Sequence, residues 1–399
     1  MFAYFNLEKI YQFLLIALAF LLPLTVFGAN LVVVIICTLW LSTGKYKSKF
    51  NQITNNKFIL ASIVFFCIHV VGLIWTEDFS WGLHIVHKMW YFIGLLPILF
   101  TIVKKDHIGY YTSAFLLAIS VSEIASYLVW FEIVEPFKYA SVLNPTPFMS
   151  HISYNPILAF AIYLVTHQLF FNKKLSNLVF SLYGFFAVSM TVNMFITGGR
   201  AGHVAFFVIL TILIFQFFDK ERIKSIVTIL VVIPGIFFTS YFSSDLFQKR
   251  VNSVYYEAGY LSKSIDSSVG LRINYTINSW QIIKENPIIG VGTGDFPNEY
   301  LKIHQVKSPD LSATSNPHNM YILVLVQLGL LGLASMLAIF YYQIKYSYNS
   351  SNKFIRDVGI TLPLMFLVVM LSDSYLLGHY TTLMYVFFSS FLYKDFEKS

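Results

Sequence analysis

Long apolar runs alternate with short polar segments along the whole chain. A helix needs about 20 mostly apolar residues to cross a bilayer, and twelve runs approach that length. They are approximately residues 9–27, 28–42, 58–75, 87–103, 110–132, 154–171, 177–197, 201–218, 224–241, 317–344, 357–374 and 376–393. Pro23 and Gly28 favour a broken hairpin for the first two runs. The pattern predicts an all-α polytopic membrane protein with about 12 transmembrane helices.

Composition excludes the other broad classes of protein. Of the 399 residues, 57% are hydrophobic and only 12% are charged, whereas about 25% are charged in ordinary soluble domains. The same abundance of apolar side chains excludes an intrinsically disordered chain. The two cysteines, Cys37 and Cys67, both lie in apolar runs, which excludes a disulfide framework and a paired-cysteine metal site.

The basic residues are distributed unevenly between the two sides of the predicted membrane. With the N-terminus placed inside, the inner segments hold 17 of the 27 basic residues and only 7 acidic ones. The rest of the chain holds 10 basic and 13 acidic residues. Because cytoplasmic loops carry an excess of lysine and arginine, both termini are expected in the cytoplasm. The net charge of +7 therefore reports membrane topology and does not indicate a nucleic-acid partner.

One predicted outer segment is much longer than the others. Residues 242–316 would form a 75-residue periplasmic loop, and loops of this length are usually functional. The expected organisation is one integrated membrane domain, with transmembrane helices 1–9 in residues 1–241, the periplasmic catalytic loop in 242–316 and transmembrane helices 10–12 in 317–399.

Short helices are expected within this loop. Periodicity predicts a helix over residues 270–285, with Ser267 or Ser268 as its N-cap and Asn286-Pro287 as its end. One apolar face of this helix would consist of Ile273, Ile277 and Trp280. A second short helix is expected from Asp295 to about His304.

The first candidate for chemistry is the turn Thr197-Gly198-Gly199-Arg200, at the outer end of the seventh and eighth spans. Glycines let the chain turn sharply and would leave Arg200 near a helix N-terminus, where backbone N–H groups attract anions. A tight turn with an arginine extended to the membrane surface is the simpler interpretation. Arg200 is nevertheless the only basic residue of this outer turn, so it is a candidate anion ligand.

The second candidate is Arg272, expected in the first turn of the loop helix. A positive charge is mildly unfavourable at a helix N-terminus, and an anionic ligand would remove that conflict. An ion pair with Asp266 or Glu257 would explain Arg272 equally well.

The third candidate is the segment from Asn286 to Phe296, which contains Gly290, Gly292 and Gly294. A dinucleotide-binding loop would need a preceding strand and a βαβ unit, and the sequence predicts neither. The glycines instead favour a rigid turn that returns the chain to the bilayer.

The fourth candidate is Asn316-Pro317-His318-Asn319, which opens the tenth span. Asn316 suits an N-cap and Pro317 the first helical position, so His318 would lie in the first turn. There the positive helix end favours a neutral imidazole, which can accept a proton from a hydroxyl. The alternative is an interfacial histidine that only hydrogen-bonds a neighbour. If His318 is not the base, Asp295 or Glu299 is the next candidate.

No metal site is expected. The ten histidines show no HExxH or comparable spacing, and the acidic residues of the outer loop are scattered, with no D-x-D pair to hold a divalent cation.

Taken in order, these segments resemble the O-antigen ligase and O-antigen polymerase superfamily of bacterial inner membranes, including the lipid A core:surface polymer ligases. The resemblance covers about residues 197–332, and the twelve spans extend it over the chain. It rests on the Gly-Gly-Arg turn followed by Gly270-Leu271-Arg272, Glu285-Asn286-Pro287, Gly290-Val291-Gly292-Thr293-Gly294, Asn316-Pro317-His318-Asn319 and Leu328-Gly329-Leu330-Leu331-Gly332. Gly72-Leu73-Ile74-Trp75-Thr76 is also similar to the family.

This resemblance implies a GT-C-like membrane fold and a metal-independent, inverting glycosyltransferase that uses no cofactor. The implied donor is a glycan on undecaprenyl diphosphate, and the implied acceptor is a sugar hydroxyl of the lipid A core oligosaccharide. The site would face the periplasm from the inner membrane, among membrane lipids. The family's paired arginines map onto Arg200 and Arg272, and its catalytic histidine maps onto His318. Gly199 and Asn319 are expected beside the donor.

Two alternatives remain open. Within the superfamily, the chain could be a polymerase that joins repeat units, or a ligase whose acceptor is a protein. Outside enzymes, a polytopic transporter would need polar groups at mid-bilayer. This chain offers mainly Glu123 there, whereas its candidate residues gather at the outer surface.

Overall fold

The computed structural model describes residues 2–259 and 267–396, and over these ranges the protein is helical, without a β-strand. Each of the twelve predicted spans contains a helix. Seven of the helices in the described ranges are long and apolar enough to cross a membrane. The number becomes eight if α2 (Val26–Ser42) and α3 (Tyr46–Thr54), bent by 115°, form one broken span. The all-α membrane fold is confirmed, while the count of twelve and the GT-C-like arrangement stay predictions.

The chain divides into two compact units, each assembled from separate stretches of sequence. Unit 1 consists of Met1–Leu39 and Ile102–Asn252, and unit 2 consists of Trp40–Thr101 and Ser253–Ser399. The two units are therefore described separately. The predicted boundaries at residues 241 and 316 stay predictions.

Unit 1 is built around one fully packed helix, α8. Its neighbours are α9 and α10, while α1 packs on α7. Because an apolar bilayer leaves polar groups without water, they must pair inside the protein. The Tyr154 hydroxyl on α8 donates to Asn193 on α9 (2.9 Å), and the Asn193 amide donates to Ser126 on α7 (3.0 Å). The bounds are α1 Phe2–Leu21, α7 Ile108–Trp130, α8 His151–Phe171, α9 Asn177–Ile196, α10 Arg200–Phe217, α11 Arg222–Ser243 and α12 Asp245–Gly259, of which α12 runs on into unit 2.

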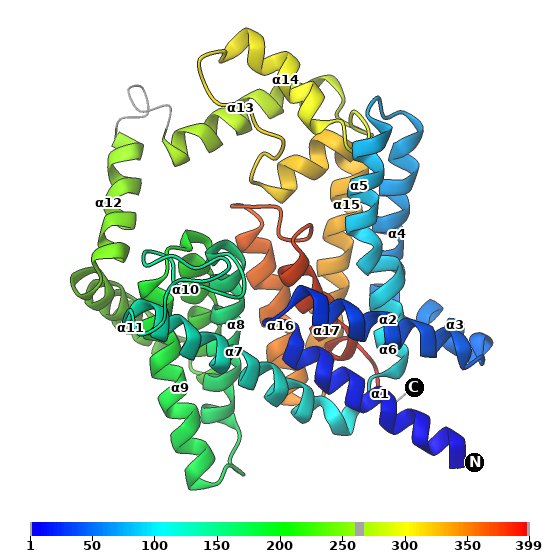
Figure 1. Ribbon diagram of the computed structural model, residues 1–399, viewed down its shortest axis with the longest axis vertical. Helices are drawn as coiled ribbons and strands as arrows, with labels where there is room; N and C mark the ends of the chain where they lie inside the picture. The colour runs from blue at the N-terminus through cyan, green and yellow to red at the C-terminus, as the bar shows by residue number, and fades with distance from the viewer. Residues whose placement is uncertain (1, 260–266, 397–399) are drawn as a thin grey trace. The chain divides into compact units, whose positions relative to one another are not determined.

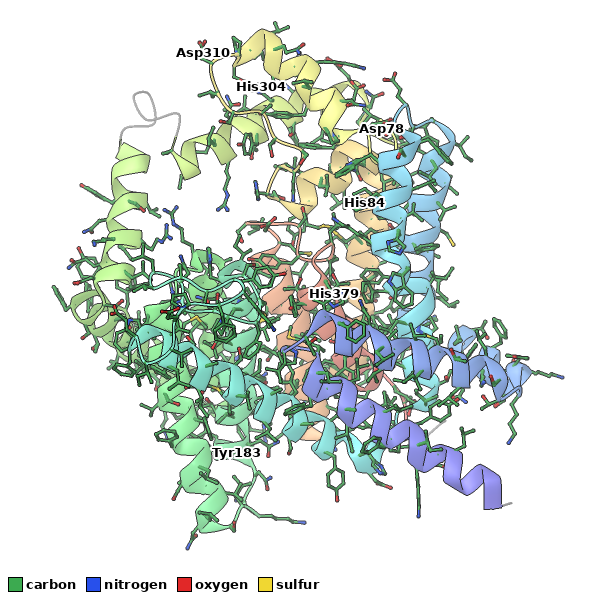
Figure 2. The ribbon with its side chains drawn as sticks, viewed as in Figure 1. Asp78, His84, Tyr183, His304, Asp310 and His379 are labelled. Atoms are coloured by element: carbon green, nitrogen blue, oxygen red, sulfur yellow. The ribbon has the colours of Figure 1, made fainter. Side chains whose placement is uncertain are left out.

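Unit 2 is built around the pair α4 and α15, with α16 packed on α15 (Figure 1). The two loop helices α13 and α14 lie over the first turns of α15, where Tyr275, Phe296 and Tyr300 pack with Ile322 and Leu323. Asp78, before α5, and His304, on α14, lie at this same end of the unit (Figure 2). The bounds are α4 Lys57–Val71, α5 Phe79–Trp90, α6 Leu96–Ile102, α13 Ser268–Glu285, α14 Phe296–Lys307, α15 Met320–Tyr348, α16 Lys353–Val369 and α17 His379–Leu392.

The predicted loop helices are confirmed, and the apolar face of the first, with Ile273, Ile277 and Trp280, is exposed. The Ser267 side chain caps α13 by accepting from Gly270 N, and the helix ends at Glu285. Ile277 and Trp280 are 60% and 51% exposed, whereas Tyr275 is buried. The helix turns its mixed face inward because the polar Asn278 side chain finds a buried partner in Ser308 Oγ (2.9 Å).

The glycine segment forms the predicted rigid turn, and it also completes α15. Gly329 interrupts that helix with φ 60° and ψ −156°. The backbone groups released there pair with the turn: Leu330 N donates to Pro287 O (2.9 Å), and Val291 N donates to Val326 O (2.9 Å). This close backbone approach explains why both segments need glycine, since a Cβ on Gly290 would lie 2.4 Å from Gln327 C.

We expect Gly290→Ala to destabilise unit 2. Gly290 has φ 71°, and its added Cβ would overlap backbone atoms. Gly44 is a matched control, because it has φ 60° but nothing within 4 Å of an added Cβ. Gly44→Ala should cost about 1–2 kcal/mol from the left-handed backbone alone, and Gly290→Ala about 1–3 kcal/mol more from overpacking. Thermal unfolding in detergent measures both; equal losses would contradict the close backbone approach.

The predicted topology can be tested with two exposed serines. In a Cys37→Ala/Cys67→Ala background, Ser312→Cys should react with a membrane-impermeant thiol reagent in intact spheroplasts, because residues 242–316 are predicted to be periplasmic. Ser351→Cys, in a predicted cytoplasmic turn, should react only after lysis. Both side chains are exposed, so a reversed labelling pattern would overturn the topology.

Candidate active site

The Gly-Gly-Arg turn of unit 1 joins α9 to α10 and is pressed against α8. Gly199 occupies the N-cap position, and Arg200 is the first residue of α10, as predicted. Asn155 of α8 fastens the turn, since the Thr197 hydroxyl donates to its Oδ1 (2.9 Å). A Cβ on Gly199 would lie 2.7 Å from Asn155 Cγ, and one on Gly202 would lie 2.1 Å from Asn155 Cβ. These glycines are required because α8 and α10 touch backbone to backbone.

A second arginine, Arg250 of α12, lies beside this turn. Its Nη2 would be 3.0 Å from a Cβ placed on Gly198. The Gly198 N–H donates to Asn144 Oδ1 (3.1 Å). Arg200 and Arg250 therefore flank the start of a helix whose own backbone N–H groups also favour anions. Sequence reasoning singled out Arg200 and passed over Arg250; the only signal was a Lys249-Arg250 pair in a predicted outer loop.

In unit 2, the helix start at His318 differs from the prediction. Helix α15 begins at Met320, and its N-cap is Asn319, whose Oδ1 accepts from Tyr321 N (3.0 Å) and Ile322 N (3.1 Å). The predictions that Asn316 caps the helix and that His318 lies in its first turn are therefore wrong. The reason is local: Asn316 Oδ1 accepts from His318 N (3.0 Å) and closes a turn of its own.

His318 is held in a strained conformation beside a carboxylate. Its φ of 52° lies in the left-handed region, which costs a non-glycine residue on the order of 1–3 kcal/mol and is found mostly at functional sites. His318 Nδ1 lies 3.4 Å from Asp373 Oδ1. That separation is slightly longer than an optimal hydrogen bond, as is common for catalytic pairs without substrate.

Asp373 reaches this position on the loop between α16 and α17. Met320 N donates to Met370 O (2.9 Å) and the Asn319 amide to Leu371 O (3.2 Å), so the two loops are joined. Burial alone would raise the pKa of Asp373, but the nearby His318 ring, a hydrogen bond from Ser374 N (2.7 Å) and the positive charge of Arg272 outweigh it and hold that pKa below its ordinary value. Asp373 therefore stays ionised at neutral pH.

Arg272 belongs to the same cluster as His318 and Asp373. It lies in the second turn of α13, since the helix starts at Ser268, so the conflict predicted for a first-turn arginine is weaker. Its charge acts on Asp373 and on Tyr275. The Tyr275 ring is stacked on the His318 ring with centroids 6.3 Å apart. The ion pairs suggested with Asp266 and Glu257 involve side chains outside the described residues.

Asp295 and Glu299, the next candidates for the base, both bond other residues. Asp295 is 1% exposed, and its oxygens accept from Thr76 Oγ1 (2.7 Å), Glu77 N (2.8 Å) and Asp78 N (2.8 Å). Glu299 pairs with Lys302. Asp295 thus fastens the segment between α4 and α5 to the glycine turn.

The segment that contains these residues also matches a known protein family. Residues 185–337 match the profile of the O-antigen ligase family. The resemblance to the O-antigen ligase superfamily is thereby confirmed. The matched range includes Gly199, Arg200, Arg272, His318 and Asn319. O-antigen ligases are glycosyltransferase-like enzymes.

A similar full-length relative is also known. The chain is 25% identical to an uncharacterized protein of Haemophilus influenzae over 352 residues, which is 83% of this chain and 84% of that protein. The likeness to this protein thus extends beyond the O-antigen ligase segment, residues 185–337, on its N-terminal side.

Proposed function

We propose that this protein is an O-antigen ligase that transfers a glycan from undecaprenyl diphosphate to a sugar hydroxyl of the lipid A core. The observation that carries the proposal is the His318–Asp373 pair beside Arg272, at the start of α15 and within the O-antigen ligase segment. The reaction would take place at the periplasmic face of the inner membrane.

His318 acts as the general base in this proposal. Its Nε2 takes the proton of the acceptor hydroxyl as the oxygen attacks the anomeric carbon of the donor. Asp373, ionised and half-buried, accepts the Nδ1–H, fixes the ring orientation and stabilises the imidazolium that forms. The left-handed backbone of His318 and its stacking on Tyr275 hold the ring in place.

The arginines act on the leaving group. As the new glycosidic bond forms, the bond from the anomeric carbon to the diphosphate oxygen breaks, and its electron pair leaves on that oxygen. Arg200 and Arg272 neutralise the developing charge through bidentate hydrogen bonds. Attack opposite the diphosphate inverts the anomeric configuration. Among the described residues, no group of three or more His, Cys, Asp or Glu side chains is arranged to hold a metal ion.

Two further residues would support the donor. Gly199 would let the diphosphate approach the start of α10, because this N-cap residue has no side chain. Asn319 would act by fixing the start of α15 behind His318, since its amide already caps that helix and bonds Leu371 O.

Deletion of the gene tests the proposal and separates ligase from polymerase. A ligase deletion should remove all polymer from lipid A while polymer accumulates on the carrier lipid. A polymerase deletion should instead leave lipid A with single repeat units. Unchanged lipopolysaccharide on gels would contradict both and would favour the transporter or a protein acceptor.

A further inference from the structure

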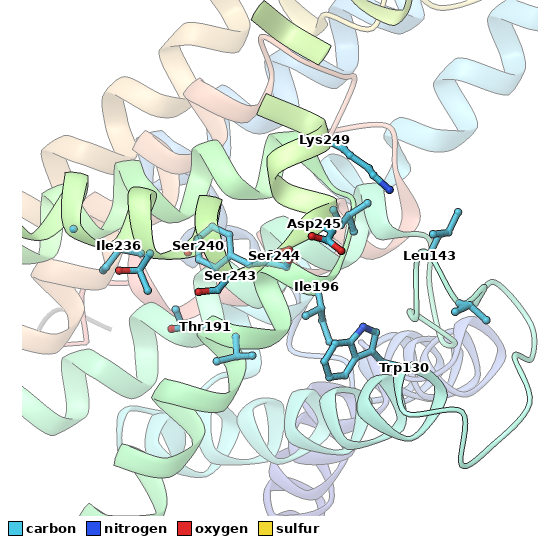
Figure 3. Close-up of a pocket in the computed structure, with 16 residues that line it drawn as sticks. Trp130, Leu143, Thr191, Ile196, Ile236, Ser240, Ser243, Ser244, Asp245 and Lys249 are labelled. Atoms are coloured by element: carbon cyan, nitrogen blue, oxygen red, sulfur yellow. The ribbon is translucent and has the colours of Figure 1, made fainter. Parts of the chain in front are cut away.

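Unit 1 contains a cavity of about 820 Å³ that the site described above does not use. It lies between the outer halves of α9 and α11 and is closed by the end of α7 and the start of α12 (Figure 3). Its volume falls within the range of about 300–1,000 Å³ found for sites that bind small molecules. The cavity is therefore large enough to hold part of a ligand.

Apolar side chains form much of the cavity wall. Val192, Phe195 and Ile196 of α9 line it together with Ile236 of α11 and Trp130. Of the residues of α11, only Ser225 is buried, so the helix that forms one wall is otherwise open to lipid. Val192 is itself 47% exposed. A hydrocarbon chain could therefore enter sideways from the membrane.

One end of the cavity is polar and carries a basic group. Ser244, Asp245 and Lys249 lie toward this end, and Lys249 lies on the side of the cavity opposite Thr191 and Trp130 (Figure 3). The Lys249 side chain is exposed, and the next residue is Arg250. Although Asp245 is acidic, Lys249, Arg250 and Arg200 leave this end positive, which suits an anionic head group.

The polar end also adjoins the Gly-Gly-Arg turn at three points. Leu143, which lines the cavity, precedes Asn144, and Asn144 accepts the Gly198 N–H. Ser244 Oγ donates to Phe195 O (2.7 Å) just before the turn. Lys249 precedes Arg250, whose guanidinium lies over Gly198. An anion held at this turn would thus lie beside the mouth of the cavity.

We infer that this cavity holds the first isoprene units of the polyprenyl diphosphate donor, with Lys249 and Arg250 at its mouth beside the diphosphate. The inference rests on the proposed function and adds to it the place where the carrier chain enters the protein. An isoprenoid attached to a diphosphate at Arg200 must bury its first carbons near the turn, and the cavity offers apolar walls there.

Gly235 provides a variant that fills the cavity without a clash. It lines the cavity, and nothing lies within 4 Å of a Cβ added to it. Gly235→Phe should weaken binding of undecaprenyl diphosphate to the full-length protein in detergent by about tenfold or more. The phenyl ring would displace at least two methylene groups of the isoprenoid from the cavity, and the burial of each contributes to the affinity. Binding of inorganic diphosphate, which has the head group alone, should be unchanged. Gly184→Phe is the matched control: Gly184 lies on α9, also has nothing within 4 Å of an added Cβ, and does not line the cavity.

A second measurement does not depend on a variant. A polyprenyl diphosphate with a diazirine on its second isoprene unit should crosslink to α9 and α11 of the wild-type protein, and undecaprenyl diphosphate should compete.

If the wild type binds the donor but Gly235→Phe has no effect and crosslinks fall elsewhere, this inference is wrong and the proposed function stands. A co-purifying phospholipid that Gly235→Phe expels without changing donor affinity would also overturn it. If the wild type binds no polyprenyl diphosphate, the proposed function fails as well.

Discussion

His318→Ala should reduce the rate of glycan transfer by about 10²–10⁴-fold, the usual contribution of a general base. Affinity for the donor should change little, because the proposed diphosphate ligands are arginines. In the wild type the rate should also fall as the pH is lowered, since a protonated imidazole cannot take the acceptor proton. That acid limb should be absent from the His318→Ala profile. Steady-state rates across pH, with donor binding measured separately, check all three points.

Asp373→Asn separates the orienting role of the carboxylate from simple packing. The asparagine has nearly the same shape but no charge to stabilise the imidazolium, so the rate should fall by at least about tenfold while the protein keeps its thermal stability.

If His318→Ala abolishes donor binding but bound donor still reacts, His318 is a binding residue. Because Asp295 and Glu299 are engaged elsewhere, the Asp373 carboxylate would then be the next candidate for the base.

Arg200→Lys and Arg272→Lys should each reduce transfer by about 10–100-fold, the loss expected when a charge-assisted hydrogen bond worth about 1.5–3 kcal/mol is removed. Lysine keeps the positive charge, but it cannot make the planar bidentate contact with a phosphate. Arg222→Lys is a suitable control, because Arg222 is exposed at the start of α11, on the predicted cytoplasmic side. Normal activity in both Arg200→Lys and Arg272→Lys would show that bidentate hydrogen bonding is not needed. The arginines would then contribute only their positive charge or a structural contact.

The sequence predicted the helices well because hydrophobic run length is a strong signal. It also predicted the glycine turn, the caps of α13 and the location of Arg200 at a helix start, each from local chemistry. Those features depend on a few consecutive residues, so no knowledge of distant contacts was needed.

What the sequence missed depends on contacts between distant segments. Asp373 is 55 residues from His318, and periodicity placed it inside a predicted span; a lone carboxylate at the end of an apolar run was the available signal. Asn316 looked like a helix cap, but its side chain closes a turn at His318 instead. Arg250 beside Gly198 could not be foreseen, because α12 returns to the turn through tertiary packing.

The buried face of α13 also depends on contacts with distant segments. Ile273, Ile277 and Trp280 are exposed, whereas Asn278 and Ser279 are buried. Partners from α14 and its following segment, including Ser308, make that polar burial favourable.

The most direct measurement is glycan transfer by the purified full-length protein in excess EDTA, with undecaprenyl-diphosphate-linked glycan as donor and lipid A core as acceptor. The proposed function predicts a glycan joined to the lipid A core with inverted anomeric configuration, at an undiminished rate, and release of undecaprenyl diphosphate. No product, or a product formed only after Mg²⁺ or Mn²⁺ is restored, would contradict it.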